Sequence, residues 1–172
     1  MLRRKEVDST VGLRCVDRTY EQQHAFNCPY QLSLLPTEKD FPELLAQGKG
    51  KLVRAIQRRK EETQSDMPED ADLYTFTAQE GDLLVLGTDG LFDNLFIHEV
   101  CQLAGEAMGP LDSGSPTDPA TIAQALVKAA FHRSVDRAAR SPFGEHAKQA
   151  GLYHTGGKMD DITCVCAWLV KG

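Results

Sequence analysis

Long hydrophobic runs, zinc-type cysteine pairs and an excess of positive charge are all missing from this sequence. No stretch approaches the roughly 18 consecutive apolar residues that a membrane-spanning helix needs. The formal net charge of −6 at pH 7 argues against general binding to nucleic acid or to anionic membranes, because such binding relies on a cationic surface. Small phosphorylated groups are not excluded, since their recognition is local.

The five cysteines show neither a C-x-x-C pair nor partner histidines at zinc spacing. An odd number of cysteines without a secretory hydrophobic segment fits a reducing compartment, so we expect an intracellular protein. Cys164 and Cys166 lie two residues apart in a strand-like run. Their side chains should therefore share one face and pack as small hydrophobic residues.

The order of predicted elements favours an α+β fold. With 172 residues, of which 41% are hydrophobic, the chain is long enough for one domain with a core. Helical spacing of apolar residues is typical of two helices, at 97–108 and after Pro119. Strands are expected at 12–17 and 30–35, in a hairpin over 73–86, and at 162–170. This order predicts helices packed on an antiparallel sheet.

One segment is strongly basic: residues 48–62 read GKGKLVRAIQRRKEE, and a polar, proline-containing stretch continues to residue 70. We interpret 48–70 as an insertion that forms a surface helix or loop. A run of charges is more often a solvated face than a binding patch, so the solvated face is the favoured interpretation.

A short apolar run ends at an acidic loop near the middle of the chain. Residues 83–93 read LLVLGTDGLFD, which predicts a buried strand with Asp89 at its rim. Gly90 would allow a tight turn, and Asp93 could then face the same space as Asp89. A strand that delivers a carboxylate at its end is a common way to hold a divalent cation.

A second acidic loop precedes the last predicted strand. There Gly156, Gly157, Lys158 and Met159 are followed by Asp160 and Asp161. Two carboxylates that follow two glycines just before a strand make a second candidate set of oxygen ligands. Together the two loops predict a site for a hard cation of the magnesium or manganese kind.

The spacing of residues around these carboxylates excludes some of the reactions and metal sites in which they could take part. An aspartyl-phosphate phosphatase would need its nucleophile two residues before Asp89, where the chain has Gly87. An EF-hand would need oxygen ligands at positions 1, 3 and 5 and a glutamate at 12, and neither loop has them. Hydrolysis by metal-activated water stays open. So does the simpler alternative that Asp89 and Asp160 only cap turns.

Longer phrases carry a family resemblance. GDLLVLGTDGLFDNL and GGKMDDITCVCAWLV resemble the last two metal-binding motifs of the metal-dependent Ser/Thr protein phosphatases, the PPM or type 2C family. DRTYEQQHAFNCPYQLSLLP and SPFGEHAKQAGL resemble more narrowly the branch associated with mitochondria and plastids. The resemblance covers most of the chain outside the basic insertion.

By this resemblance, Asp89 and Asp160 are expected to be ligands of a centre with two or more Mn²⁺ or Mg²⁺ ions. Asp93 would contribute to a further, weaker metal site. Asp161 would be an orienting neighbour, Gly90 would support the first loop, and Gly157 would shape the turn that aims Asp160. The implied fold is the second half of an α-β-β-α sandwich of antiparallel sheets flanked by helices.

The implied activity is hydrolysis of phosphoserine and phosphothreonine in protein substrates, in a mitochondrion or plastid, with the cytoplasm as the alternative. However, the motif that carries the family's metal-bridging aspartate is not found before Asp17. We therefore expect residues 1–172 to be the C-terminal portion of a phosphatase domain. The alternative is a catalytically inactive phosphatase-like module that binds a partner protein, so whether the chain is an enzyme stays open at this point.

Overall fold

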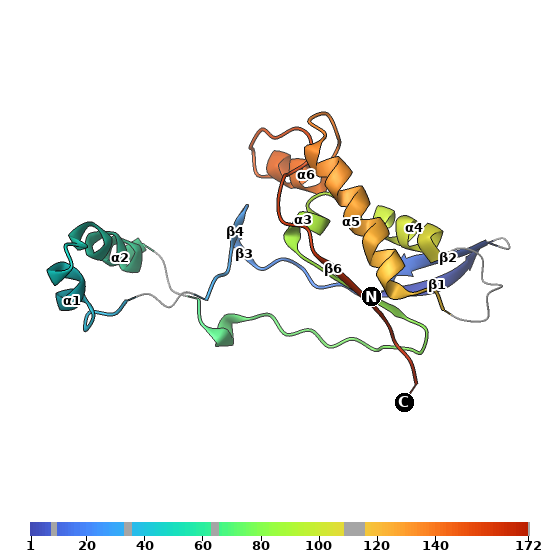
Figure 1. Cartoon of the computed structure of the whole chain (residues 1–172), viewed down its shortest axis with the longest axis horizontal. Helices are drawn as coiled ribbons and strands as arrows, with labels where there is room; N and C mark the ends of the chain where they lie inside the picture. Colours follow the sequence, from blue (N-terminus) through green and yellow to red (C-terminus); the bar gives the residue numbers. More distant parts are fainter. Residues whose placement is uncertain (8–9, 33–35, 63–65, 109–115, 172) are drawn as a thin grey trace. The chain divides into compact units, whose positions relative to one another are not determined.

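The computed structural model describes residues 1–7, 10–32, 36–62, 66–108 and 116–171. These residues form two compact units, one made of Met1–Thr19 with Thr75–Gly172 and the other of Tyr20–Tyr74. Figure 1 colours both units along the chain. Among the described residues, no helix is both long enough and apolar enough to cross a membrane.

The first unit is built on a four-stranded antiparallel sheet with the strand order β2-β1-β5-β6. Its strands are β1 (Leu2–Val7), β2 (Thr10–Cys15), β5 (Leu83–Gly87) and β6 (Cys164–Trp168). β5 pairs with β6 from Leu83↔Trp168 to Gly87↔Cys164. Because these two strands are antiparallel, the end of β5 lies beside the start of β6. The two acidic loops therefore meet at one end of this strand pair.

Helices pack on one face of this sheet. α4 (Ile97–Met108) packs against β2, α5 (Pro119–Val135) packs against β6, and the two helices contact each other (Figure 1). Asp118 begins α5 by accepting a hydrogen bond from the Ala120 N–H. The core between the sheet and the helices contains fully buried Leu83, Leu91, Ile122 and Leu126.

The opposite face of the β5–β6 pair is apolar and open. Leu86 and Val165 are directly paired across the strands, and their exposed fractions are 55% and 54%. An apolar face of this kind is the face that packs on a second sheet in a β-sandwich. The expected α+β class, with helices on an antiparallel sheet, is confirmed.

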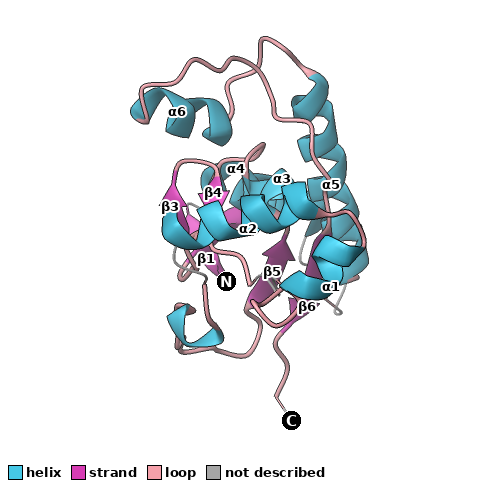
Figure 2. Ribbon diagram, turned by 90° about the vertical axis from the view of Figure 1, so that its left-hand side faces the viewer, coloured by secondary structure: helices cyan, strands magenta, loops and turns pink. Residues whose placement is uncertain are grey.

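The second unit combines a short hairpin with two helices (Figure 2). The hairpin joins β3 (Gln23–Ala25) to β4 (Cys28–Pro29), and the helices are α1 (Phe41–Ala46) and α2 (Gly50–Glu62). A 3-10 helix, η1 (Pro68–Asp70), follows. Buried Phe41, Val53 and Ile56 make a small core of their own between α1 and α2.

Most predicted elements are present. The helices at 97–108 and after Pro119 are confirmed, and most of the basic block forms the helix α2. The strand predicted at 30–35 is wrong over its described part, because Leu32 forms only an isolated bridge with Asp66. Residues 33–35 and 63–65 lie outside the described residues.

The hairpin predicted over 73–86 is also wrong. The turn at 79–82 exists, with the Asp82 N–H donating to the Gln79 carbonyl at 3.1 Å, but residues 73–78 lie in no strand. β5 pairs instead with β1. The sequence of β1, LRRKEV, has four charged residues and therefore did not predict a strand. Arg3 of β1 binds buried Asp82 at 2.7 Å, and this ion pair joins β1 to the start of β5.

Candidate metal centre

The first acidic loop is one turn of helix placed at the end of β5. Thr88 precedes α3 (Asp89–Phe92), and the Asp93 N–H donates to the Asp89 carbonyl at 2.7 Å. Asp89 and Asp93 are four residues apart in this turn, so their side chains lie on one side of it. The Thr88 hydroxyl donates to the Asp161 carbonyl at 2.8 Å and accepts the Thr163 N–H at 3.0 Å. These two bonds fix the first loop to the second.

Gly90 is required for close packing of the two loops and not for the tight turn that was predicted. It belongs to α3 and has no positive φ, so no special turn conformation depends on it. Instead, a Cβ atom at this position would lie 2.6 Å from the backbone carbonyl oxygen of Asp161. Gly90 thus allows the backbones of the two acidic loops to touch.

The second acidic loop is shaped by its two glycines. Gly156 adopts a φ of +87°, which favours glycine, and its carbonyl accepts a hydrogen bond from buried Ser141 at 2.7 Å. A Cβ on Gly157 would lie 1.9 Å from the Arg133 carbonyl at the end of α5. The loop therefore packs directly on helix backbone before it reaches Asp160.

A buried asparagine joins the two acidic loops through hydrogen bonds to their backbones. Asn94, fully buried, donates to the carbonyl oxygens of Gly90 at 2.9 Å and Lys158 at 2.8 Å. Its side-chain oxygen accepts the Lys158 N–H at 3.0 Å. The backbone positions that carry Asp93 and Asp160 are thereby held relative to each other.

Three carboxylates from the two acidic loops lie close together. Asp89, Asp93 and Asp160 each offer an oxygen atom, and these atoms lie within 4.8 Å of one another. Their side-chain exposures grade from 59% for Asp89 through 35% for Asp160 to 9% for Asp93. The cluster is open to solvent on the Asp89 side and closed on the Asp93 side.

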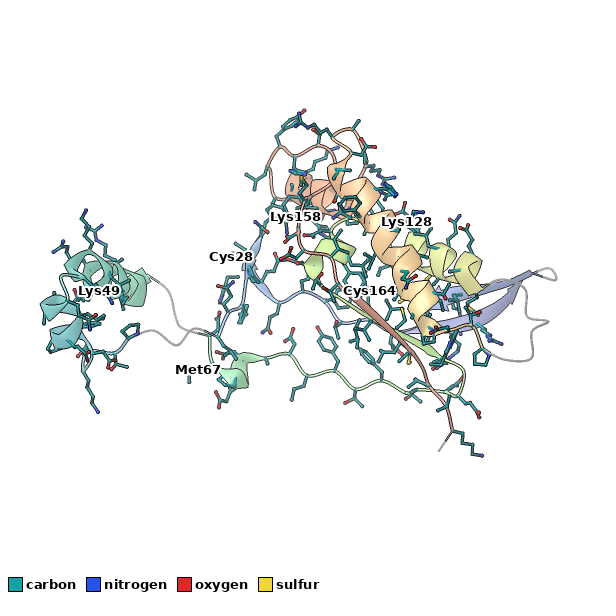
Figure 3. The ribbon with its side chains drawn as sticks, in the orientation of Figure 1. Cys28, Lys49, Met67, Lys128, Lys158 and Cys164 are labelled. Atoms are coloured by element: carbon teal, nitrogen blue, oxygen red, sulfur yellow. The ribbon has the colours of Figure 1, made fainter. Side chains whose placement is uncertain are left out.

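Lys158, which is labelled in Figure 3, lies among these carboxylates. Its Nζ is 2.7 Å from Asp93, 2.9 Å from Asp160 and 3.7 Å from Asp89. Burial raises the pKa of Asp93, and the hydrogen bond from Lys158 only partly offsets that effect. The same lysine lowers the pKa of Asp160. Burial alone would lower the pKa of Lys158, but its hydrogen bonds to Asp93 and Asp160 outweigh it and raise that pKa.

The predicted site residues thus divide into two groups. Asp89, Asp93 and Asp160 come together, with Gly90 and Gly157 at the close backbone contacts beneath them. Asp161 contributes through its backbone, since its N–H donates to the Asp160 carboxylate at 2.9 Å while its side chain is exposed. Lys158 and Asn94 were not predicted as site residues. Their positions directly beside the acidic motifs were the only sequence signal for them.

Curated protein phosphatases are similar to most of the chain. No family model matches the chain. The chain is 32% identical over 150 residues to probable protein phosphatase 2C 80 of Arabidopsis thaliana, covering 87% of this chain and 28% of that protein. It is 33% identical over 152 residues to the human protein phosphatase PTC7 homolog, covering 88% of this chain and 42% of that protein. The chain therefore spans less than half the length of these curated relatives.

A solved structure shares the fold. The photosystem II phosphatase PBCP superposes with a TM-score of 0.62 at 26% sequence identity, over 98% of this chain and 55% of that structure. The sequence matches and the structural match each cover nearly nine tenths of the chain or more. Over most of its length the chain is thus similar to proteins of the protein phosphatase 2C family.

Proposed function

We propose that this chain carries metal ligands of a phosphatase that hydrolyses phosphoserine and phosphothreonine in proteins. The observation that carries the proposal is the convergence of the Asp89, Asp93 and Asp160 carboxylates from two loops far apart in the sequence. The relationship to protein phosphatases 2C supports phosphoproteins as the substrate class.

The residues at the site fit a hard divalent cation. All three donors are carboxylate oxygens, which are the ligands that Mg²⁺ and Mn²⁺ take in proteins. In the proposed site Asp89 and Asp160 hold the metal, and Asp93 contributes to a weaker position. When bound, such ions supply an activated water molecule and neutralise phosphoryl oxygens. Gly90 and Gly157 keep the two loops in contact, and the Asp161 N–H orients the Asp160 carboxylate.

We also propose that residues 1–172 correspond to the C-terminal portion of a phosphatase domain, with 48–70 as an insertion. The share of the relatives that the chain covers supports a correspondence to part of such a protein. So does the open apolar face at Leu86 and Val165, where a second sheet would pack. Residues 50–62 of the insertion form the helix α2 in the second unit. A mitochondrial or plastid location is proposed from the family resemblance.

The test is Mn²⁺-dependent release of phosphate from a phosphothreonine peptide by the full chain. We expect Asp89→Asn and Asp160→Asn each to abolish hydrolysis and to weaken Mn²⁺ binding, because each removes one negative ligand. Asp118→Asn is the matched control. It makes the same chemical change at the first turn of α5, where asparagine also caps a helix well.

The possible results separate the two candidate functions. Activity that is lost in both site variants and kept in the control supports the phosphatase. A folded chain that releases no phosphate contradicts catalysis by these residues alone. It would favour either a portion of a phosphatase domain that needs further residues for activity or the alternative of a catalytically inactive module that binds a partner protein.

A further inference from the structure

Lys158 occupies the centre of the carboxylate cluster. Its ammonium group makes hydrogen bonds to Asp93 and Asp160 and lies within ion-pair distance of Asp89. Its side chain is only 17% exposed, although lysine normally extends into solvent. The ring of Phe143 covers it, with Nζ 5.0 Å from the ring centroid. One positive charge is thus enclosed by three negative charges and an aromatic face.

The backbone from which this side chain extends is fixed. The Lys158 N–H and carbonyl both bond to buried Asn94, which directly follows Asp93 in the sequence. On the other side, the Phe143 N–H donates to the Asp93 carbonyl at 3.1 Å, so the covering ring is tied to the same loop. Lys158 therefore reaches the cluster from an anchored position and not from a free surface strand.

We propose that Lys158 is a tethered counter-cation that shares its position with the divalent metal ion, so that metal entry requires its ammonium group to leave the cluster. This inference rests on the proposed metal site. Three carboxylates whose oxygens lie within 4.8 Å repel one another unless a cation lies between them. Lys158 supplies that cation within the chain itself. A metal ion using the same oxygens would be repelled by an ammonium group 2.7 to 2.9 Å from two of them.

Two consequences follow from a shared position. The ammonium group keeps the carboxylates together without metal, so the loops stay in place. It also lowers the apparent affinity for metal, because each binding event must break its hydrogen bonds to Asp93 and Asp160. Lys158 thereby sets the metal concentration at which the centre fills.

The experiment compares Mn²⁺ binding to the full chain and to Lys158→Met, at one pH, by titration calorimetry and by electron paramagnetic resonance of free Mn²⁺. Methionine keeps an unbranched side chain beneath Phe143 and removes the charge. We expect Lys158→Met to bind Mn²⁺ on the order of tenfold more tightly than the wild type. Lys128→Met, which removes an exposed lysine from α5, should bind like the wild type (Figure 3). Lys158→Gln replaces Lys158→Met if circular dichroism shows that the latter is unfolded.

Removal of a nearby positive charge could tighten binding without any displacement, so a second measurement follows the ammonium group itself. Acetic anhydride labelling with mass spectrometry should show Lys158 protected in the metal-free wild type and more reactive after Mn²⁺ is added. Lys128 should be unchanged in both states. Tighter binding together with increased labelling supports the shared position.

Three results would overturn the proposal, and they are distinguishable. Wild-type binding of Mn²⁺ with equal or weaker binding by Lys158→Met excludes competition. Tighter binding with unchanged labelling of Lys158 excludes displacement. Absence of Mn²⁺ binding by every variant means that the proposed metal site has failed, and the inference fails with it.

Discussion

Asn94 binds the backbone of Lys158 at both its N–H and its carbonyl, in the manner of a neighbouring strand. The two bonds measure 3.0 and 2.8 Å, and Asn94 is fully buried. The Asn94 side chain thus makes hydrogen bonds of the kind that pair two strands, outside the residues over which β5 and β6 pair. The Asn94 amide therefore joins the two acidic loops, together with the hydrogen bonds of Thr88.

Replacement of Asn94 should consequently damage both the fold and the site. We expect Asn94→Ala to lower the free energy of unfolding by about 3 kcal/mol, since it leaves buried backbone groups without their partner. Asn94→Asp keeps the size and the acceptor but loses the donor, so it should cost at least as much. Urea denaturation measures both variants.

Gln102→Ala is the control for this prediction. Gln102 is exposed on α4 and its side chain donates to Glu106 one turn later, so its loss should change stability by less than about 0.5 kcal/mol. If Asn94→Asp were as stable as the wild type, the amide donor would have no role in joining the loops.

Two glycines should respond in opposite directions to the same substitution. In Gly90→Ala the new methyl group meets the Asp161 carbonyl at 2.6 Å, and the loops must separate. We expect a loss of about 1–3 kcal/mol and weaker Mn²⁺ binding. Gly105 lies within α4, where a Cβ would meet its nearest neighbour at an ordinary 3.8 Å. Gly105→Ala should therefore stabilise the chain by about 0.5–1 kcal/mol.

Thermal and urea unfolding of both glycine variants, with Mn²⁺ titration of each, measure these effects. The contrast is informative because the chemical change is identical. Gly90→Ala with wild-type stability and metal binding would show that the backbones of the two loops are not in contact.

The sequence predicted the carboxylates better than it predicted their surroundings. Asp93 faces the same space as Asp89, as predicted, but one turn of helix brings the two together and not a tight turn at Gly90. Their meeting with Asp160 depends on the antiparallel pairing of β5 and β6, which the sequence could only suggest through the strand ends. Pairing partners are set by long-range contacts, so a local pattern carries little information about them.

The wrong hairpin prediction and the failure to predict Lys158 also come from long-range contacts. Alternation over 73–78 predicted a hairpin, but β5 takes β1 as its neighbour, although most residues of β1 are charged. Lys158 was not predicted as a site residue, because its burial comes from Phe143 and from a loop distant in the sequence. Residues whose role depends on tertiary neighbours are those that local patterns miss.

Thiol reactivity should report the packing of α4. Cys101 is buried in that helix, and burial raises the pKa of its thiol, whereas Cys28 is exposed in β4. Because the thiolate is the reactive form, iodoacetamide should modify Cys28 on the order of ten times faster than Cys101. Mass spectrometry of the native chain measures both rates, and the urea-unfolded chain is the control, in which the rates should converge. Equal native rates would mean that α4 is not packed as described.

The ion pair between Arg3 and Asp82 should make stability depend on pH. Hydrogen bonding to Arg3 lowers the pKa of Asp82 below its ordinary value of 3.8, and the carboxylate is nearly inaccessible to solvent. A carboxyl group whose pKa is lower in the folded state stabilises the fold above its unfolded pKa. That contribution is lost as the pH falls through the folded pKa. The stabilisation from Asp82 should therefore be complete at neutral pH and decline below about pH 4.

Arg3→Met isolates this contribution. We expect the variant to lose about 2 kcal/mol at pH 7, where it leaves a buried carboxylate without its main partner, and to lose less at pH 3.5. Arg14→Met is a matched control, because Arg14 is exposed and is paired with Arg3 across β1 and β2. Its effect should be small and independent of pH. Urea unfolding at pH 7, 5 and 3.5 measures both variants. A difference between Arg3→Met and the wild type that stays constant over this range would exclude Asp82 as the titrating group, because only a change in its protonation links the two.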